Sequence, residues 1–296
     1  MLDWRRYLGQ PGYSPASKPD EAQLLGQVRR LEVRARQAMM SGLAGQYRSA
    51  FKGRGLEFEE VREYHTGDDV GTIDWNVTAR TGRLHVKLYR EERDLTVFVL
   101  ADISASTRFG SGVMTVHDMI AEVAGLFALA AARRDRVGAI LYGSSLAKVI
   151  PPRRSWRHGL RVVRELLSVE PEIRADRTAV GEAMQTAGRL LHRRGIVLVV
   201  TDAACSLPLR ELTGLWAKHE VVVIRVSDPL MEGLRAPVVL PVREAEGRGR
   251  GLLAGPVRVR RISTPRGLDV LDLSTQEDYL PAVRALLKRR EKRRVR

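Results

Sequence analysis

The stretch "LTVFVLADISAS", residues 95–106, decides the fold. Its first seven positions are almost entirely apolar, which is typical of a strand that is buried on both faces of a sheet. The run ends at Asp102, and Ser104 and Ser106 follow at alternate positions. Such residues often do no more than cap a turn. They indicate a binding site only if other polar residues converge on the same strand end.

Strands and helices alternate after this stretch. Apolar runs predict further strands at 136–143, 195–202 and 220–228. A short strand at 147–150 is expected to pair with 136–143 as a hairpin. Helical periodicity predicts helices at 114–133, 156–168, 180–193 and 208–218. This alternation predicts an α/β fold, with a doubly wound, mostly parallel sheet and helices on both faces. Ligands of such sheets bind beyond the carboxyl ends of the strands.

The rest of the chain divides into shorter regions. A helix is expected from about Pro19 to between Met40 and Gly45, and a hairpin with its loop at Pro265–Gly267 is expected before a closing helix. We therefore predict four regions: an N-terminal loop and helix (1–48), a small turn- and strand-rich subdomain (49–94), the α/β domain (95–228), and a C-terminal hairpin with a basic helix (229–296).

The charge of the chain is strongly positive but unevenly placed. Of the net charge of +15, eight basic residues and one acidic residue lie within 284–296, whereas 51–94 contains eight basic and ten acidic residues. Aromatic residues make up only 5% of the chain, and no nucleic-acid-binding motif is present. A nucleic-acid partner is therefore not expected, and the basic end is interpreted as a solvated helix end.

The sequence also argues against a membrane-spanning, a secreted or a disulfide-bonded protein. No apolar run reaches the length of a membrane span, and the N-terminus "MLDWRRYLGQ" lacks the apolar core of a secretory signal, so we expect a cytoplasmic protein. Cys205 is the single cysteine, which excludes an internal disulfide and predicts a lone buried thiol.

A second carboxylate is predicted at the same strand edge. Asp202 ends the apolar strand at 195–202, and Thr178 lies in a loop just before a helix that can return it to that edge. With Asp102, Ser104 and Ser106 these residues would supply only oxygen ligands. Such a set suits Mg²⁺ (or Mn²⁺) and does not suit soft metals.

The segment "DISAS" resembles the metal-ion-dependent adhesion site of von Willebrand factor A domains, which has the form D-x-S-x-S. Thr178 and Asp202 stand in the order of that family's remaining elements. The resemblance implies that Ser104, Ser106 and Thr178 contact the metal. It also implies that Asp102 and Asp202 act through bound water or as acceptors that orient the hydroxyls.

A longer run resembles the bacterial "domain of unknown function 58" family, whose von Willebrand factor A-like proteins are commonly associated with MoxR-type AAA+ ATPases. The run is "FKGRGLEFEEVREYHTGDDVGTIDWNVTARTGRLHVKLYREERDLTVFVLADISAS". Its matching elements include Arg62-Glu63-Tyr64, Gly67-Asp68-Asp69, Ile73-Asp74-Trp75 and Ala79-Arg80. Members of the family often carry an Arg after Gly-Asp-Asp, where this chain has Val70-Gly71.

Charges of opposite sign alternate within that run. They predict a network of ion pairs that clamps a compact subdomain, or else a partner surface, formed by Arg62, Glu63, Asp68, Asp69, Asp74 and Arg80. Trp75 is predicted to be the apolar anchor of this subdomain.

No catalytic residue is predicted. The chain lacks a G-x-S-x-G nucleophile elbow, an H-E-x-x-H zinc motif and a P-loop. We therefore expect a non-enzymatic module whose metal binds a carboxylate of a partner, which by resemblance is a MoxR-like AAA+ ATPase acting in chaperone-type assembly or maturation of a client protein. The alternative is a metal-assisted phosphoester hydrolase at the same site. The basic tail is expected to contact the ATPase or, peripherally, a membrane face.

Overall fold

The computed structural model describes residues 21–51, 56–91, 95–169, 178–232, 239–243, 250–254 and 265–295. The chain divides into two compact units. The sheet unit comprises residues 1–51 and 96–296, and the hairpin unit comprises residues 52–95.

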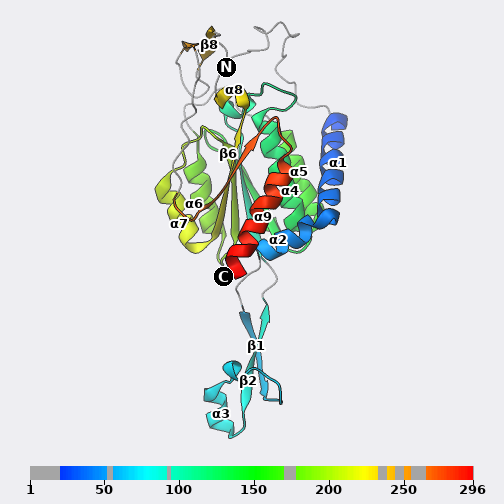
Figure 1. The fold of residues 1–296 in the computed structure, drawn as a ribbon, viewed down its shortest axis with the longest axis vertical. Helices are drawn as coiled ribbons and strands as arrows, with labels where there is room; N and C mark the ends of the chain where they lie inside the picture. Colours follow the sequence, from blue (N-terminus) through cyan, green and yellow to red (C-terminus); the bar gives the residue numbers. More distant parts are fainter. Residues whose placement is uncertain are drawn as a thin grey trace. The chain divides into compact units, whose positions relative to one another are not determined.

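A six-stranded sheet forms the centre of the sheet unit (Figure 1). Its strand order is β10-β7-β6-β3-β4-β5, and every neighbouring pair is parallel except the antiparallel pair of β4 and β5. The strands are β3 (Thr96–Asp102), β4 (Arg136–Tyr142), β5 (Leu146–Arg153), β6 (Ile196–Asp202), β7 (Glu220–Ser227) and β10 (Asp269–Ser274). The predicted fold class, an α/β fold with a mostly parallel sheet and helices on both faces, is confirmed.

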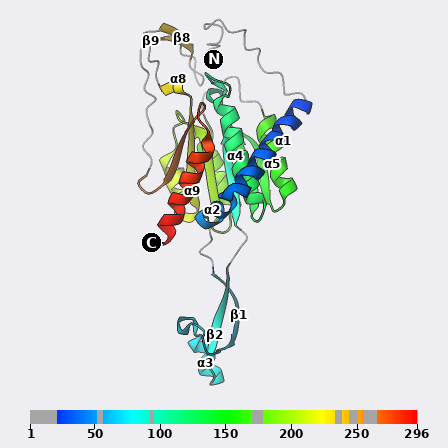
Figure 2. The same ribbon diagram turned by 45° about the vertical axis from the view of Figure 1, so that its right-hand side comes forward.

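Helices cover both faces of the sheet (Figures 1 and 2). One face carries α4 (Val116–Ala132) and α5 (Trp156–Ser168), and the other carries α6 (Val180–Leu190) and α7 (Leu209–Lys218). Almost every residue of α4 is buried, because α1 and α5 lie over the side of α4 that faces away from the strands. A capping box of Thr115 and Asp118 fixes the start of α4.

The N-terminal helix is longer than predicted and is kinked. Helix α1 (Glu21–Ala38) runs into an irregular turn, Met39–Leu43, and continues as α2 (Ala44–Ala50). Gly42 has φ = 98°, a left-handed conformation that glycine adopts without strain. This turn redirects the chain at the place where a helix end was predicted.

The C-terminal region adds a parallel strand pair that the sequence did not predict. Residues 269–274, expected as one arm of a hairpin around Pro265–Gly267, pair in parallel with β7 as strand β10. Parallel pairing at that position covers the open edge of β7, which would otherwise present unpaired backbone groups. The other half of the expected hairpin, 256–264, lies outside the described residues. An antiparallel hairpin forms instead between β8 (Val239–Arg243) and β9 (Arg250–Ala254), after the short helix α8 (Pro229–Glu232).

The closing helix α9 (Tyr279–Val295) is fixed to the sheet by one buried cation. Arg290 is 8% exposed, forms ion pairs with Asp269 and Glu220, and places its guanidinium 4.6 Å from the ring centre of Phe51. Arg293 also pairs with Asp269, at 2.9 Å. The basic helix end is therefore not only a solvated end, as the sequence indicated, because part of its charge holds the helix in place.

The hairpin unit is built on two antiparallel strands, β1 (Leu56–Glu63) and β2 (His85–Glu91). A short turn (Val70–Thr72) and helix α3 (Trp75–Thr81) connect them, and Ile73 bridges to Val86 of β2. Asp74 caps α3 by accepting from the backbone amides of Asn76 and Val77. Across the parts of the chain described, no helix combines the length and the apolar character that crossing a membrane requires.

Candidate functional site

The carboxylate of Asp102 organises the loop that follows β3. It is fully buried, and one of its oxygens accepts a 2.9 Å hydrogen bond from the backbone amide of Ser104. The other accepts a 2.5 Å hydrogen bond from the hydroxyl of Thr201 on β6. Asp102 thus ties the loop to its own strand and that strand to its neighbour.

The two serines of the loop connect it to the end of β6. The hydroxyls of Ser104 and Ser106 lie 3.1 Å apart, and Ser106 donates to the carboxylate of Asp202. The second oxygen of Asp202 accepts from the backbone amide of Cys205. Four predicted site residues, Asp102, Ser104, Ser106 and Asp202, therefore form one hydrogen-bonded cluster with Thr201 at the carboxyl ends of β3 and β6.

Thr178 belongs to the same edge by its backbone. The amide of the next residue, Ala179, donates a 2.7 Å hydrogen bond to the carbonyl of Gly143, which directly follows β4. The last residue of β4, Tyr142, is the register partner of Asp102. The strand edge that carries the cluster therefore also receives the start of α6.

The electrostatics of the cluster follow from its burial. Burial, and next the nearby charge of Asp202, raise the pKa of Asp102 from 3.8 to about 7. Burial, and next the nearby charge of Asp102, raise the pKa of the Tyr142 hydroxyl well above its ordinary value. A cation bound beside these two carboxylates would stabilise their charged forms.

The donor set of the cluster fits a hard divalent cation. It consists of serine and threonine hydroxyls and two carboxylates, which are the oxygen ligands that Mg²⁺ and Mn²⁺ prefer. Within the described residues no group of three or more His, Cys, Asp or Glu side chains is suited to a metal ion. A metal at this edge would therefore depend on the hydroxyls of Ser104, Ser106 and Thr178.

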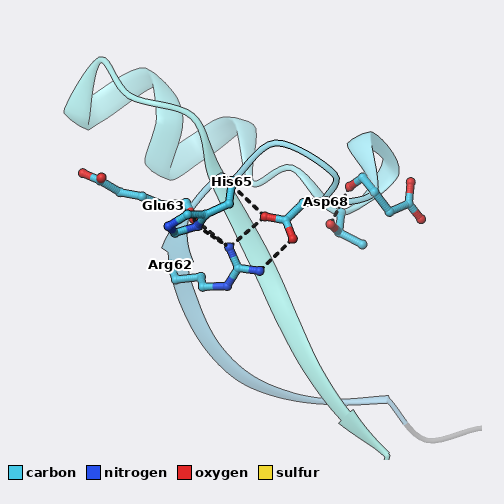
Figure 3. A network of polar contacts seen from close by, with 6 residues as sticks. Arg62, Glu63, His65 and Asp68 are labelled. Carbon is cyan, nitrogen blue, oxygen red and sulfur yellow. Dashed lines mark hydrogen bonds and ion pairs between the residues drawn. The ribbon is translucent and has the colours of Figure 1, made fainter.

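Figure 3 shows a network of polar contacts in the hairpin unit that joins Arg62, Glu63, His65 and Asp68. Arg62 makes two 2.7 Å hydrogen bonds to the carboxylate of Asp68, which also accepts from the backbone amide of His65. These contacts lower the pKa of Asp68 to about 2, with the Arg62 hydrogen bond as the largest cause. Glu63 pairs with Arg83, at 3.0 Å. The sequence did not single out Arg83.

The remaining signature residues act at turns or face solvent. Asp69 caps the turn at Val70–Thr72, and Asp74 caps α3 and lies 3.5 Å from the ammonium group of Lys87. Arg80 is exposed on α3.

The prediction that Trp75 anchors the hairpin unit is wrong. Its side chain is 66% exposed. The reason is that Asp74 caps α3, which places Trp75 on the first turn of the helix, away from the strands. Among the side chains of this unit that the structure describes, Val86 is a buried apolar residue, 1% exposed.

A sequence model of the family described as "Protein of unknown function DUF58" matches residues 60–248. The chain belongs to this family. The match includes every predicted site residue of this DUF58 member, from Arg62 to Asp202. It begins after α1 and α2 and ends before β10 and α9.

Relatives and similar structures add no assigned activity. The uncharacterized protein Rv1480 of Mycobacterium tuberculosis is 30% identical over 212 residues, which cover 71% of this chain and 67% of that protein. An uncharacterized Mycobacterium bovis protein, Mb1516, matches to the same extent. The structure of the conserved hypothetical protein BatB of Bacteroides thetaiotaomicron is 16% identical with a TM-score of 0.46, over 67% of this chain and 99% of that one. Manganese-loaded TRAP protein of Plasmodium vivax is 17% identical with a TM-score of 0.42, over 67% and 74%.

Two residues of the cluster were missed by sequence reasoning. Thr201 and Tyr142 were read as parts of apolar strands, although both lie against Asp102. Thr201 carried a usable signal, because it is a hydroxyl residue directly before Asp202 in the otherwise apolar run "IVLVVTD". Tyr142 carried none, since tyrosine is common in strands.

Proposed function

We propose that this DUF58 member is a non-enzymatic, metal-dependent protein-binding module. Its partner is a MoxR-like AAA+ ATPase, and the pair acts in chaperone-type assembly or maturation of other proteins. The observation that supports the proposal is the cluster in which Ser106 bridges the loop after β3 to Asp202 of β6. That bridge sets hydroxyl and carboxylate oxygens side by side at a strand edge.

The residues of the cluster have distinct tasks in this proposal. Ser104, Ser106 and Thr178 hold Mg²⁺ or Mn²⁺, and Asp102 and Asp202 orient the hydroxyls and supply negative charge. The metal offers one coordination position to a carboxylate of the partner. Thr201 keeps Asp102 in its orientation through the 2.5 Å hydrogen bond.

Phosphoester hydrolysis is less well supported. A hydrolase would need a general base that is free to take a proton from water. Asp102 is fully buried and accepts hydrogen bonds on both oxygens, and Asp202 accepts from Ser106 and from the Cys205 amide. Both carboxylates are thus occupied in holding the loop.

Isothermal titration of Mg²⁺ and Mn²⁺ into the full chain tests the metal site. We expect saturable binding by the native protein, much weaker binding by Ser106→Ala, and native binding by Ser206→Ala. Ser206 is the matched control, because it is an exposed serine on the loop after β6. A Ser106→Ala variant that binds metal as the native protein does would refute the assignment.

Capture of a purified MoxR-like ATPase tests the partner. Capture should be lost with a chelator and with Ser106→Ala, and kept with Ser206→Ala. Capture that survives the chelator would mean that the interaction uses another surface and does not depend on the metal.

A further inference from the structure

Exposed arginines of the sheet unit gather at the end where β4 begins and β5 ends. Arg133 and Arg134 follow α4, and Arg136 opens β4. The strand register sets Val137 opposite Arg153, the last residue of β5. We name this surface the basic pole; its five members are all exposed and are Arg133, Arg134, Arg136, Arg153 and Arg157.

Among the described residues, no carboxylate forms an ion pair with the arginines of the basic pole. Asp135, the acid between its arginines, is only 6% exposed and accepts a 3.2 Å hydrogen bond from Tyr47. Neighbouring cations outside the pole have their own carboxylates: Arg36 pairs with Glu32, Lys148 with Glu165 and Arg164 with Glu21.

The basic tail of the chain is less available than the basic pole. Arg290 and Arg293 form ion pairs with Asp269. Arg284 donates to the backbone carbonyl of Ser41, and Arg289 donates to that of Val270. Four of the eight basic residues of 284–296 are therefore bound to the protein itself.

An exposed apolar side chain borders the basic pole. Arg133 lies 4.0 Å from the sulfur of Met39, which is buried. The next residue, Met40, is 86% exposed at the turn between α1 and α2. Guanidinium groups beside an exposed methionine combine electrostatic attraction with an apolar group that can enter a lipid interface.

We propose that the basic pole binds the surface of an anionic phospholipid bilayer. A bilayer fits better than nucleic acid, because single-stranded nucleic acid needs free aromatic faces for base stacking. Trp156, the aromatic residue beside the pole, has Arg36 over its ring at 5.3 Å and donates its indole N–H to Glu32 at 3.2 Å. Its ring is therefore already occupied.

The basic pole and the candidate metal site lie at opposite ends of the same strands. Arg136 is the register partner of Thr96, at the start of β3, and Tyr142 is the partner of Asp102, at its end. A sheet unit bound through its basic pole would turn Ser104 and Ser106 away from the bilayer. This proposal does not depend on metal binding.

Co-sedimentation of the full chain with vesicles tests the proposal. Vesicles of phosphatidylcholine alone are compared with vesicles that also contain phosphatidylserine. The triple variant Arg134→Gln, Arg153→Gln, Arg157→Gln is compared with Arg189→Gln, Arg210→Gln, Lys218→Gln, which removes the same charge from α6 and α7 on the other face. All six residues are exposed, so both variants should fold.

We expect the native chain to sediment only with phosphatidylserine and to release as salt rises. The pole variant should lose about a hundredfold in affinity, at roughly fivefold for each arginine, and the matched variant should bind as the native chain does. Met40→Ser should weaken binding further. Equal losses in both triple variants would overturn the proposal by showing a general charge effect. So would tighter binding to a DNA oligonucleotide than to the vesicles.

Discussion

The hydroxyl of Thr201 donates a 2.5 Å hydrogen bond to the carboxylate of Asp102, across the junction of β3 and β6. This contact holds a carboxylate where no water reaches it, since both side chains are fully buried. The same carboxylate also accepts a hydrogen bond from the backbone amide of Ser104, which ties down the start of the loop after β3. The energetic consequence of this burial is measurable as a pH dependence.

The free energy of unfolding should fall as pH rises through the range set by Asp102. Its pKa is about 7 in the folded chain against an ordinary value of 3.8. Between these values the folded state holds a proton that the unfolded state releases, so folding is favoured at the lower pH and loses this stabilisation as pH rises. Asp102→Asn should remove this contribution. Urea unfolding of both proteins in a chelator, across that range, measures the difference.

Other carboxylates, such as Asp68 with its lowered pKa, change the free energy of unfolding in the opposite direction as pH rises. Their contributions are the same in both proteins and cancel when the variant is compared with the native chain. The variant should gain stability relative to the native chain as pH rises. A difference between the two proteins that is the same at every pH would contradict the raised pKa of Asp102.

Arg290→Met should be strongly destabilising, by about 3 to 5 kcal/mol, because it removes the buried cation that two poorly hydrated carboxylates share. Those carboxylates belong to Asp269 and Glu220. Lys292→Met, at an exposed position on the same helix, should change stability by no more than about 0.5 kcal/mol. Denaturant unfolding monitors both variants, and equal effects would mean that Arg290 is not a structural cation.

Trp75→Ala should leave the hairpin unit stable, with a change within about 0.5 kcal/mol, because its side chain is mostly exposed. Val86→Ala should cost about 1 to 3 kcal/mol, since it removes buried apolar volume from a small unit. Hydrogen exchange of the β1 and β2 amides reports on this unit directly. Faster exchange in Trp75→Ala than in Val86→Ala would restore the anchor role that we rejected.

Gly159→Ala should destabilise the chain by about 1 to 3 kcal/mol even though alanine favours helices. A Cβ atom at Gly159 would lie 2.6 Å from the Cβ of Ala132, where α5 crosses α4. Gly214→Ala on α7 is the matched control, because a Cβ atom there has no heavy atom within 4 Å. It should stabilise by about 0.5 to 1 kcal/mol. Thermal unfolding distinguishes the opposite signs.

The sequence predicts the sheet well where burial is continuous. The strands ending at Asp102 and Asp202 are apolar on both faces, so their pattern has few alternative interpretations. The parallel pairing of β10 was not predicted, because it depends on a partner about fifty residues away, and a local sequence pattern does not encode that partner. The turn at Gly42 was placed at a helix end, where glycine is also common.

The candidate site was only partly predictable for a similar reason. Aspartate and serine at a strand end are visible in the sequence, whereas the contact of Thr201 with Asp102 depends on which strands are neighbours. The exposure of Trp75 was not predictable from composition, because large aromatic residues are usually buried. The role of Arg290 was hidden within a run of similar charges.

The two points at which the sheet unit is interrupted lie close together. The ring of Phe51 lies 4.6 Å from the guanidinium of Arg290, which forms an ion pair with Glu220. The backbone amide of Glu220 donates to the carbonyl of Gly195. A Cβ atom at Gly195 would lie 2.7 Å from the carbonyl oxygen of Thr96. The hairpin unit is thus an insertion whose entry and exit are neighbours. Joining the two points with a short linker would excise it and leave a continuous domain. An exchange of this insertion for another would leave the strand edge that bears the serines undisturbed, because that edge lies at the opposite end of β3 from Thr96.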